Sequence, residues 1–555
     1  MVEVGVKDES GERTMWQSVA TRIMTGTAAI AAPAGAADKV LGGTLLDRGA
    51  SARFLTQTTF GPTRSEIDRV ALIGRDLWLL EQLGKTPTLH LPRYQALLAQ
   101  SASAADARYA AWWEISLTAP DQLRQRVAFA LSEIFVVSDA DTTLNDRPMQ
   151  VTAYYDLLVR NAFGNYRSLI EQVALSQAMG LYLSHLGNDK PDPVSGRRPD
   201  ENFAREVMQL FSIGLWQLNR DGSPILDAKG EQIPTYDQEV IESYARIYTG
   251  WTWAHRTTWG RGSSVADETD APMKAFPDHH DSGSKVLIDG SLVPAGQTPE
   301  QDLKAALDSL FNHANVPPFV ARQLIIKLIT SNPSPAFIDR IARVFENNGL
   351  GVRGDLGAVV TAIFLDPEAR LGFLSDQTVY GKLKEPLLRL SQLLRAFEAS
   401  SRSGIYGVGR TQAAYAQAPL GANSVFNFFS PQFQQPGPIK NAGYYSPEFQ
   451  LQTETQGVLI VDNLGKRIAL ISATAGDNDP VLDLSSLVAE AADSSAMLDD
   501  LNVLMLGGSM STSLRDIAAR AIALTPDAGD EASRLKRAQI AVTVIAVSPE
   551  YAVQR

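Results

Sequence analysis

Residues 199–253 decide how this chain is interpreted, and they read PDENFAREVMQLFSIGLWQLNRDGSPILDAKGEQIPTYDQEVIESYARIYTGWTW. Apolar side chains recur at helical spacing on both sides of a turn-rich insert, with charged side chains set among them. This period predicts one helix that begins near Glu201 and a second that spans about Gln238 to Tyr248. Because a charge near a core is costly unless it is paired or used, the stretch is the first place to look for function.

The first of these helices gathers polar groups on one face, since residues three or four apart lie above one another. Glu201 then lies beside Arg205, and Asn202 lies beside Glu206. One interpretation is a pocket in which Glu201 or Glu206 is an acid, a base or a ligand. In that pocket Arg205 would clamp an anion and Asn202 would bind the substrate. The other interpretation is a structural network that ties the helix to its neighbours.

The second helix adds four candidate substrate-binding residues. Glu242 and Arg246 have the i, i+4 spacing of a stabilising ion pair, and the helix is expected to stop at Gly250. Trp251 and Trp253 follow directly, and an indole ring beside a polar face can stack on a sugar or another flat ligand. Filling of the core is the alternative role for both tryptophans.

Two of the six histidines are adjacent, in the run Asp278-His279-His280-Asp281-Ser282-Gly283. Imidazole and carboxylate groups in one loop suit a divalent metal such as zinc, iron or manganese, or acid–base chemistry near neutral pH. His279, His280 and Asp281 are the candidate metal ligands. His280 and Asp281 are the candidate catalytic pair, because adjacent side chains of an extended loop point opposite ways. The spacing matches no established metal motif, and a surface loop with a capped turn is the alternative.

The rest of the chain predicts a mainly α fold, a large multi-helix globular array with a few short β-hairpins. Turn residues place hairpins at 219–236 and 285–293. The run from Asn219 to Asp227 is also faintly similar to a calcium loop, although a hairpin turn explains it better. Helices are expected at residues 122–137, 151–162, 166–183, 299–311, 318–330, 335–347, 382–399, 446–462, 482–504, 511–524 and 531–547.

Four regions follow from these patterns. Residues 1–48 are expected to be a poorly ordered N-terminal arm, and residues 49–399 a helical core that carries the polar motifs. Residues 400–445 are rich in Gly, Pro and aromatic residues and are expected to form one long loop. Residues 446–555 are expected to be the C-terminal helical part of the same unit.

Composition excludes several classes of protein. The net charge of -12 over 555 residues opposes binding to a nucleic-acid backbone or to an anionic lipid surface. The absence of cysteine excludes disulfides, thiolate metal sites and a cysteine nucleophile. No apolar run approaches the ~20 residues that span a bilayer. Residues 24–37 are rich in small side chains, but acidic residues precede them, so they are not interpreted as an export signal.

The chain resembles the bacterial family known as domain of unknown function 1800, from about residue 50 to the C-terminus. The resemblance is carried by an ordered set of short elements: Ala52-Arg53-Phe54-Leu55, Phe60-Gly61-Pro62-Thr63, Arg124-x-Arg126-Val127, Glu201-Asn202-Phe203-Ala204-Arg205-Glu206, Leu210-Phe211-Ser212-Ile213-Gly214, Thr249-Gly250-Trp251, His280-Asp281-x-Gly283-x-Lys285, Lys382-x-Lys384-x-Pro386 and Ser548-Pro549-Glu550-Tyr551-Ala552-Val553-Gln554-Arg555.

The resemblance implies an exported, extracytoplasmic bacterial protein, periplasmic or secreted, that is often encoded beside a partner protein of the sulfatase-like family. It implies no reaction. Many relatives carry a Trp-His-Asn-His-Phe element after the Arg-x-Arg motif, whereas this chain reads Phe129 to Phe135 there, without either His. If those histidines bind a metal in relatives, this chain has lost that site or uses Glu133 differently.

Two functions are weighed on this basis, and whether the chain is an enzyme stays open between them. The first is a hydrolase-like enzyme that acts on a polar polymer, a glycan or a peptide. His280 and the Glu201–Glu206 face should then meet around one open cleft, which residues 400–445 could cover. The second is a non-enzymatic cell-envelope binding or assembly protein that works with the partner encoded beside it. Its partner surface would use the aromatic side chains Phe426, Phe428, Phe429, Phe433, Tyr444 and Tyr445.

Overall fold

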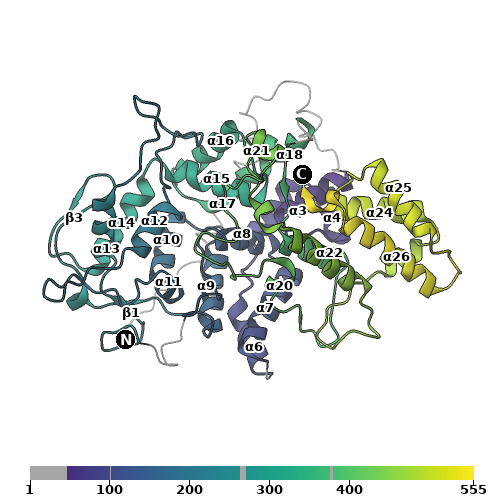
Figure 1. Ribbon diagram of the computed structural model, residues 1–555, viewed down its shortest axis with the longest axis horizontal. Coiled ribbons are helices and arrows are strands. Elements are labelled where there is room, and N and C mark those ends of the chain that lie inside the picture. The colour runs from purple at the N-terminus through teal and green to yellow at the C-terminus, as the bar shows by residue number, and fades with distance from the viewer. Residues whose placement is uncertain (1–46, 101, 263–269, 376–378) are drawn as a thin grey trace.

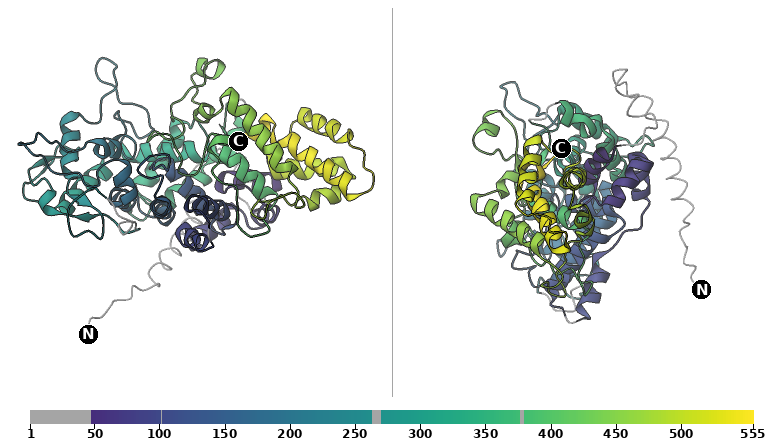
Figure 2. Two further views of the ribbon diagram at one scale, coloured as in Figure 1. Left: turned by 60° about the horizontal axis from the view of Figure 1, so that its bottom comes forward. Right: turned by 90° about the vertical axis from the view of Figure 1, so that its right-hand side faces the viewer.

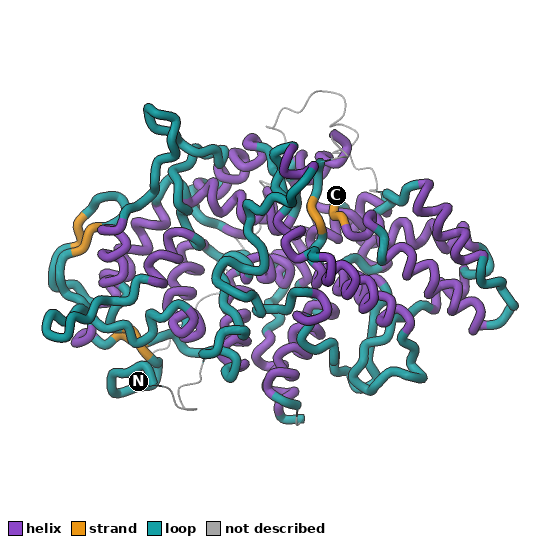
Figure 3. Tube along the Cα trace, viewed as in Figure 1, coloured by secondary structure: helices purple, strands orange, loops and turns teal. Residues whose placement is uncertain are grey.

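The computed structural model describes residues 47–100, 102–262, 270–375 and 379–555. In this part of the chain the fold is mainly α-helical, as predicted, and the only sheets are three antiparallel pairs of two-residue strands (Figure 1, Figure 3). The expected arm at residues 1–48 lies outside the described residues except for its last two. There Asp47 accepts a hydrogen bond from the backbone of Ala50 and so caps the first described helix.

The middle of the elongated molecule is built from helices of the first third and of the central part of the chain (Figure 1, Figure 2). Every residue of α8 and of α19 is buried, so these two helices run through the interior. The elements of the middle are α3 (Arg48–Thr58), α4 (Arg64–Ile73), α5 (Arg75–Leu83), α6 (His90–Leu98), α7 (Ala104–Thr118), α8 (Gln122–Ser132), α9 (Pro148–Asn161), α15 (Val316–Leu328), α16 (Pro335–Glu346), α17 (Leu356–Leu365), α18 (Pro367–Ser375), β5 (Lys382–Leu383) and α19 (Pro386–Ala396).

One end of the molecule carries the stretch from which the sequence was interpreted (left in Figure 1). Helices α12 and α13 pack together there, and α13 also contacts α14 and strand β3. The elements of this end are α10 (Tyr166–Leu175), α11 (Gln177–Tyr182), α12 (Asn202–Gln209), α13 (Gln238–Ile247), β1 (Trp251–Thr252), β2 (Lys274–Ala275), η3 (Pro277–His279), β3 (Lys285–Val286), β4 (Leu292–Val293) and α14 (Pro299–Asn312).

The opposite end is formed by the last helices of the chain (yellow in Figure 1). Its final strand, β6, returns to the middle and pairs with β5, with Lys382 opposite Gln554. Before this end the chain forms α20 (Gln412–Tyr415), α21 (Pro438–Asn441) and η4 (Pro447–Leu451), which lie over the middle of the molecule. The elements that follow are α22 (Glu454–Ala469), α23 (Ser485–Glu490), α24 (Ser494–Leu506), α25 (Thr512–Ala523), α26 (Glu531–Ala546), α27 (Pro549–Ala552) and β6 (Val553–Gln554). One apolar cluster extends from Ala52 to Tyr551 and so joins both ends.

Local capping explains most helix starts. Thr298 and Gln301 form a reciprocal capping box at the start of α14, as their spacing predicts. The hairpin at 285–293 forms as β3 and β4, with Gly290 at its turn in a left-handed conformation. The expected hairpin at 219–236 is present as isolated bridges, for example between Leu226 and Gln232.

Several predicted helices are wrong in extent. The helix expected at 382–399 is a short strand followed by α19, because Pro386 starts the helix and holds the preceding residue extended. The helix expected at 166–183 breaks at Ser176, whose backbone is extended. The helices expected at 446–462 and 482–504 each divide in two, where Thr453 and Asp493 cap a new helix. The helix expected at 122–137 ends at Ser132.

Candidate functional site

The polar face predicted on α12 forms at the surface. Glu201 accepts a hydrogen bond from Arg205 at 3.0 Å, and Gln238 of α13 donates to both oxygens of Glu201 at 3.1 and 3.2 Å. The two charged side chains are 30% and 40% exposed, so the pair lies at the water boundary. Surface ion pairs of this kind contribute about 0–1 kcal/mol, which makes the pair a weak source of stability. Asn202 is exposed beside it.

Glu206 differs from the rest of this face because it turns inward. Its side chain is buried, and its Oε2 atom has no hydrogen-bond partner among the described residues. Burial raises the pKa of Glu206, and the nearby charge of Arg205 opposes this rise in part. The pKa of Glu206 therefore lies above that of an ordinary surface glutamate.

His280 lies in a sealed network. Its Nδ1 atom faces the carbonyl oxygen of Thr249 at 2.9 Å, and its Nε2 atom lies 2.9 Å from Asp302. Asp302 also pairs with Lys285 at 2.5 Å, and the side chains of all three charged or titratable partners are fully buried. The open cleft that was expected around His280 is therefore not formed, and its catalytic role stays a prediction.

The three candidate metal ligands face different partners. His279 lies 3.1 Å from Asp189 and stacks on Trp259 at 4.2 Å, whereas Asp281 binds Arg246 at 2.9 Å. Within the described parts of the chain, no group of three or more His, Asp or Glu side chains is placed to hold a metal ion. The divalent metal thus stays a prediction from sequence, and its proposed ligands do not converge on one point.

The candidate substrate-binding residues are also dispersed. Arg246 pairs with Asp281 and not with Glu242, so the i, i+4 ion pair predicted from their spacing is wrong. Glu242 is exposed and accepts a hydrogen bond from Gln238 at 3.4 Å. Trp251 and Trp253 are 5% and 0% exposed, so neither offers a free ring face to a ligand.

The run from Asn219 to Asp227 folds as turns in which the carboxylates are already used. Asp221 accepts hydrogen bonds from the backbone and hydroxyl of Ser223 at 2.9 and 2.5 Å. Asp227 accepts from the backbone of Lys229 and Glu231 at 2.8 and 2.9 Å. The turn interpretation therefore accounts for these side chains.

A second group of charged residues, which the sequence did not single out as a site, lies in the middle of the molecule. We call it the buried charge centre, and its members are Arg126 of α8, Glu133 at the end of α8, Lys327 of α15, Lys382 of β5, Glu385 at the start of α19, and Glu448 of η4. Each is less than a tenth exposed. Three carboxylates and three cations in a dry interior are costly unless each charge is matched.

The cations tie the carboxylates together from separate elements. Lys382 lies 2.9 Å from Glu448 and 3.7 Å from Glu385, and it also donates to the carbonyl oxygens of Ile326 and Lys327 at 3.0 Å each. Lys327 lies 3.5 Å from Glu133, with its ammonium 4.1 Å from the ring centre of Phe429. The centre thus joins segments that are far apart in the sequence.

Residues 400–445 cover this centre and not the α12 face; we call them the covering segment. Gln417 donates to Glu385 at 2.6 Å and to Glu133 at 3.4 Å. Asn427, which has a left-handed backbone, donates to Glu133 at 3.5 Å. Side chains of one irregular segment therefore close the centre from solvent.

Some polar atoms inside the buried charge centre have no hydrogen-bond partner in the described part of the chain. Among the described residues, hydrogen-bond partners are lacking for Nε and Nη1 of Arg126. A buried polar atom without a partner costs about 1–3 kcal/mol, and more when it is charged. A purely structural network gains nothing from such atoms, whereas a site that receives a polar group needs them.

The two carboxylates nearest the covering segment differ in acidity. Burial, the charge of Glu385 and a hydrogen bond shared with it together raise the pKa of Glu133 to about 8, and Lys327 and Lys382 oppose this rise in part. Burial also acts to raise the pKa of Glu385, but Lys382, Lys327 and Arg126 outweigh it, so the pKa of Glu385 is lowered. At neutral pH the pair therefore holds one proton, on Glu133, beside an ionised Glu385.

Two signals in the sequence pointed to this centre. Arg126 and Lys382 belong to the Arg-x-Arg and Lys-x-Lys-x-Pro elements that carry the family resemblance, and Glu133 lies in the stretch from Phe129 to Phe135 that follows the first of them. No spacing rule links these elements, because they lie on α8 and β5, about 250 residues apart in the chain. Only the packing of the helices brings them together.

The comparisons agree with the resemblance. The family model described as Protein of unknown function (DUF1800) matches residues 53–553, which is nearly the whole chain. Neither the curated proteins nor the solved structures compared with the chain gave a match. The match includes all six residues of the buried charge centre and the α12 face. The chain belongs to the family described as Protein of unknown function (DUF1800).

Proposed function

We propose that this protein is an acid–base enzyme, hydrolase-like in its chemistry, whose reaction takes place at the buried charge centre. The supporting observation is the buried pair of Glu133 and Glu385, both contacted by Gln417. Their surroundings act in opposite directions, because the pKa of Glu133 is raised to about 8 and the pKa of Glu385 is lowered. A pair of titratable groups whose environments separate their pKa values can supply one acid and one base at the same pH.

The proposed reaction is hydrolysis of a glycosidic or amide bond in a polar polymer, a glycan or a peptide. Glu385 takes a proton from water, and the resulting hydroxide attacks the electrophilic carbon. Glu133 gives its proton to the leaving oxygen or nitrogen as the bond to carbon breaks. Glu385 is then protonated and Glu133 ionised, and the proton returns across the hydrogen bond that they share. Water is consumed, and both side chains end as they began.

The same proposal needs the covering segment to move. Gln417 and Asn427 both contact Glu133, so a substrate reaches the pair only when these contacts open. Closure would afterwards exclude bulk water and strengthen each charge interaction. The roles of Arg126, Lys327 and Lys382 are then to keep Glu385 ionised and to stabilise negative charge that develops on the substrate.

The test is a hydrolysis assay with purified protein on chitooligosaccharides, cello-oligosaccharides, peptidoglycan and casein. Release of reducing ends reports glycosidic cleavage, and release of new amino groups reports peptide cleavage. We expect one class to be cleaved, with the rate lowered by roughly 10²–10⁴-fold in Glu133→Gln and Glu385→Gln. Glu201→Gln, on the exposed α12 face, is the matched control and should keep the rate.

Two results would contradict the proposal. Full activity of folded Glu133→Gln would show that Glu133 takes no part in the reaction. Absence of cleavage of all four substrates would contradict the assignment as a hydrolase. Loss of activity in Glu201→Gln or Glu206→Gln alone would instead show that the reaction takes place at the α12 face, which is one of the interpretations of the sequence. Elemental analysis of the same protein tests the divalent metal.

The second candidate is a non-enzymatic binding or assembly protein of the cell envelope, with a sulfatase-like partner. The observation in its favour is Phe426, which is 55% exposed on the covering segment, whereas Phe429 is buried. An extracytoplasmic location is part of both proposals and rests on the family resemblance. In the part of the chain that the structure describes, no helix combines the length and the apolar character that a membrane crossing requires.

A further inference from the structure

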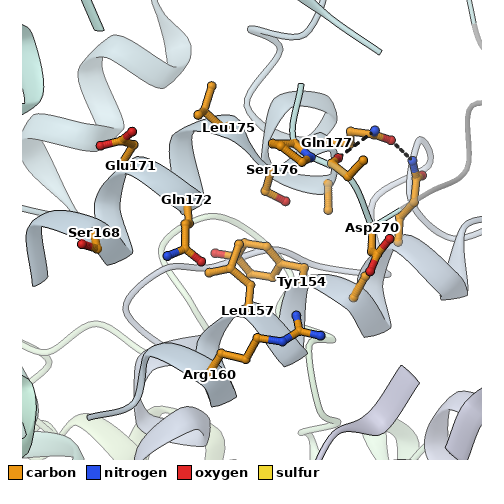
Figure 4. Close-up of a pocket in the computed structure, with 15 residues that line it drawn as sticks. Tyr154, Leu157, Arg160, Ser168, Glu171, Gln172, Leu175, Ser176, Gln177 and Asp270 are labelled. Carbon is orange, nitrogen blue, oxygen red and sulfur yellow. Dashed lines mark hydrogen bonds between the residues drawn. The ribbon is translucent and has the colours of Figure 1, made fainter. Parts of the chain in front are cut away.

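A cavity of about 430 Å³ opens between α9, α10, α11 and residues 270–272, apart from both groups discussed above (Figure 4). Its size lies within the range of about 300–1,000 Å³ that small-molecule sites occupy. Tyr154 and Leu157 supply apolar surface, and the amides and charged groups of the lining lie around them. The neighbouring residue Tyr155 is buried near Glu133, so α9 has the cavity on one side and the buried charge centre on the other.

Gln150 fixes what kind of group the cavity can accept. The side chain of Gln177 donates from Nε2 to the carbonyl oxygen of Ala271 at 2.9 Å, and a carbonyl oxygen can only accept. The other end of that amide, Oε1, therefore faces Gln150, whose Nε2 donates to it at 3.0 Å (Figure 4). Because Nε2 of Gln150 is the donor in this contact, the other terminal atom of its side-chain amide is the oxygen, Oε1.

That oxygen is an acceptor without a donor. Gln150 is 2% exposed, lines the cavity, and its Oε1 atom has no hydrogen-bond partner among the described residues. Burial of an unpaired amide oxygen is unfavourable, so the site gains most from a ligand that brings an N–H or O–H group. An inorganic anion without a proton to donate would leave this oxygen unpaired.

Two charges of opposite sign border the same cavity. Arg160, at the last turn of α9, is exposed and has no ion-pair partner in the described residues. Asp270 is exposed and likewise unpaired there, while Glu171, also in the lining, is engaged by Arg167 at 2.7 Å. Figure 4 shows Arg160 and Asp270 reaching the cavity from different elements. A neutral sugar would use neither charge, and a simple carboxylate would use only one.

We propose that this cavity binds a short peptide or an amino acid in its zwitterionic form. The ligand carboxylate would pair with the Arg160 guanidinium, which can bind it through two parallel hydrogen bonds. An N–H group of the ligand would donate to Oε1 of Gln150, and its ammonium would face Asp270. No other ligand class considered above supplies an anion, a cation and a donor together.

The binding does not depend on the hydrolysis proposed for the buried charge centre, because none of the six residues of that centre lines the cavity. The experiment is isothermal titration calorimetry of the full chain with L-alanyl-L-alanine. We expect saturable binding to the unaltered protein and a loss on the order of tenfold or more in Arg160→Gln, since one charge-assisted pair is removed. Arg198→Gln, at another exposed arginine, is the matched control and should bind as the unaltered protein does.

Three ligand variants sharpen the test. Alanyl-alanine amide lacks the carboxylate and should bind the unaltered protein as weakly as the dipeptide binds Arg160→Gln. N-acetyl-alanyl-alanine lacks the ammonium and should bind the unaltered protein more weakly than the dipeptide does. Asp270→Asn should not weaken the binding of this acetylated ligand any further. Galacturonate carries a carboxylate and hydroxyl donors but no ammonium, so its binding in place of the dipeptide would overturn the proposal. Absence of dipeptide binding at about 10 mM, or equal affinity in Arg160→Gln, would also overturn it.

Discussion

Gln417 donates hydrogen bonds to Glu385 at 2.6 Å and to Glu133 at 3.4 Å, so one amide of the covering segment touches both carboxylates of the pair. The side-chain oxygen of the same amide, Oε1, accepts a hydrogen bond from the backbone N–H of Leu387 at 3.2 Å, in the first turn of α19. The side chain thus links closure of the covering segment to the helix that positions Glu385. Predictions for stability follow from this centre and from two other buried sites.

Lys382→Met should destabilise the protein by about 3–5 kcal/mol, because it leaves Glu385 and Glu448 buried without their shared cation. The free energy of unfolding in urea measures the effect. Lys304→Met is the matched control: its ion pair with Asp308 is 74% and 38% exposed and should contribute about 0–1 kcal/mol. Equal losses in the two variants would show that the centre has no special energetic role.

Glu133 should make the protein less stable as the pH rises. Its pKa is about 8 in the folded chain, whereas an ordinary glutamate has a pKa of 4.5, so between these values the unfolded chain has released a proton that the folded chain still holds. Stability then falls by up to about 1.4 kcal/mol per pH unit across that window. In Glu133→Gln this part of the slope should vanish when urea unfolding is followed from pH 5 to pH 8. An unchanged slope would mean that Glu133 is not protonated at neutral pH.

His185 should have the opposite effect at acid pH. Its ring is buried against Phe203 at 3.9 Å, and burial lowers its pKa from 6.5 to about 4. Because the unfolded chain takes up the proton first, stability is lost as the pH falls from 6.5 towards 4, by about 3 kcal/mol in total. His185→Phe should reduce this acid sensitivity in thermal melts, whereas replacement of the exposed His255 by Gln should leave it in place.

Gly250 offers a test of close packing in the Thr-Gly-Trp element. Its φ is 84°, and an added Cβ atom would lie 2.9 Å from the Cβ atom of His280. Gly230 has nearly the same φ, 83°, with open space where its Cβ atom would be. Gly230→Ala therefore measures the backbone strain alone, about 1 kcal/mol. Gly250→Ala should cost clearly more in chemical denaturation, and equal costs would show that His280 moves aside freely.

The sequence predicts the class of fold because periodicity reports which face of a helix is buried. It also predicts the starts of α14 and α16, where Thr298 and Ser334 cap the first turn. It fails at Ser176, because an apolar period continues across a break that only the backbone conformation reveals. At Pro386 the apolar period also continues upstream, although a proline starts a helix and holds the residue before it extended. Pairing of Glu201 with Arg205 follows from helix geometry, and so it is correctly expected.

The sequence does not predict the buried charge centre, for a physical reason. Arg126, Glu133, Lys382 and Glu448 each read locally as an ordinary surface charge, and their burial depends on long-range packing of α8, β5 and η4. His280 shows the converse error: a His-Asp run resembles a reactive loop, yet Asp302, which lies 2.9 Å from its Nε2 atom, is on another element. Contacts of this kind carry no local sequence signal.

The pairing of β5 with β6 has a consequence for how the protein is made. Lys382 lies opposite Gln554, whose amide also donates to the carbonyl oxygens of Leu328 and Ile329. A nascent chain that has emerged from the ribosome only as far as α19 already contains Glu133, Glu385 and their lysines, but it lacks β6, which pairs with β5, and Glu448, which lies 2.9 Å from Lys382. We therefore expect the native surroundings of Lys382 to be completed late in synthesis, because the partner strand of β5 is among the last residues to be made.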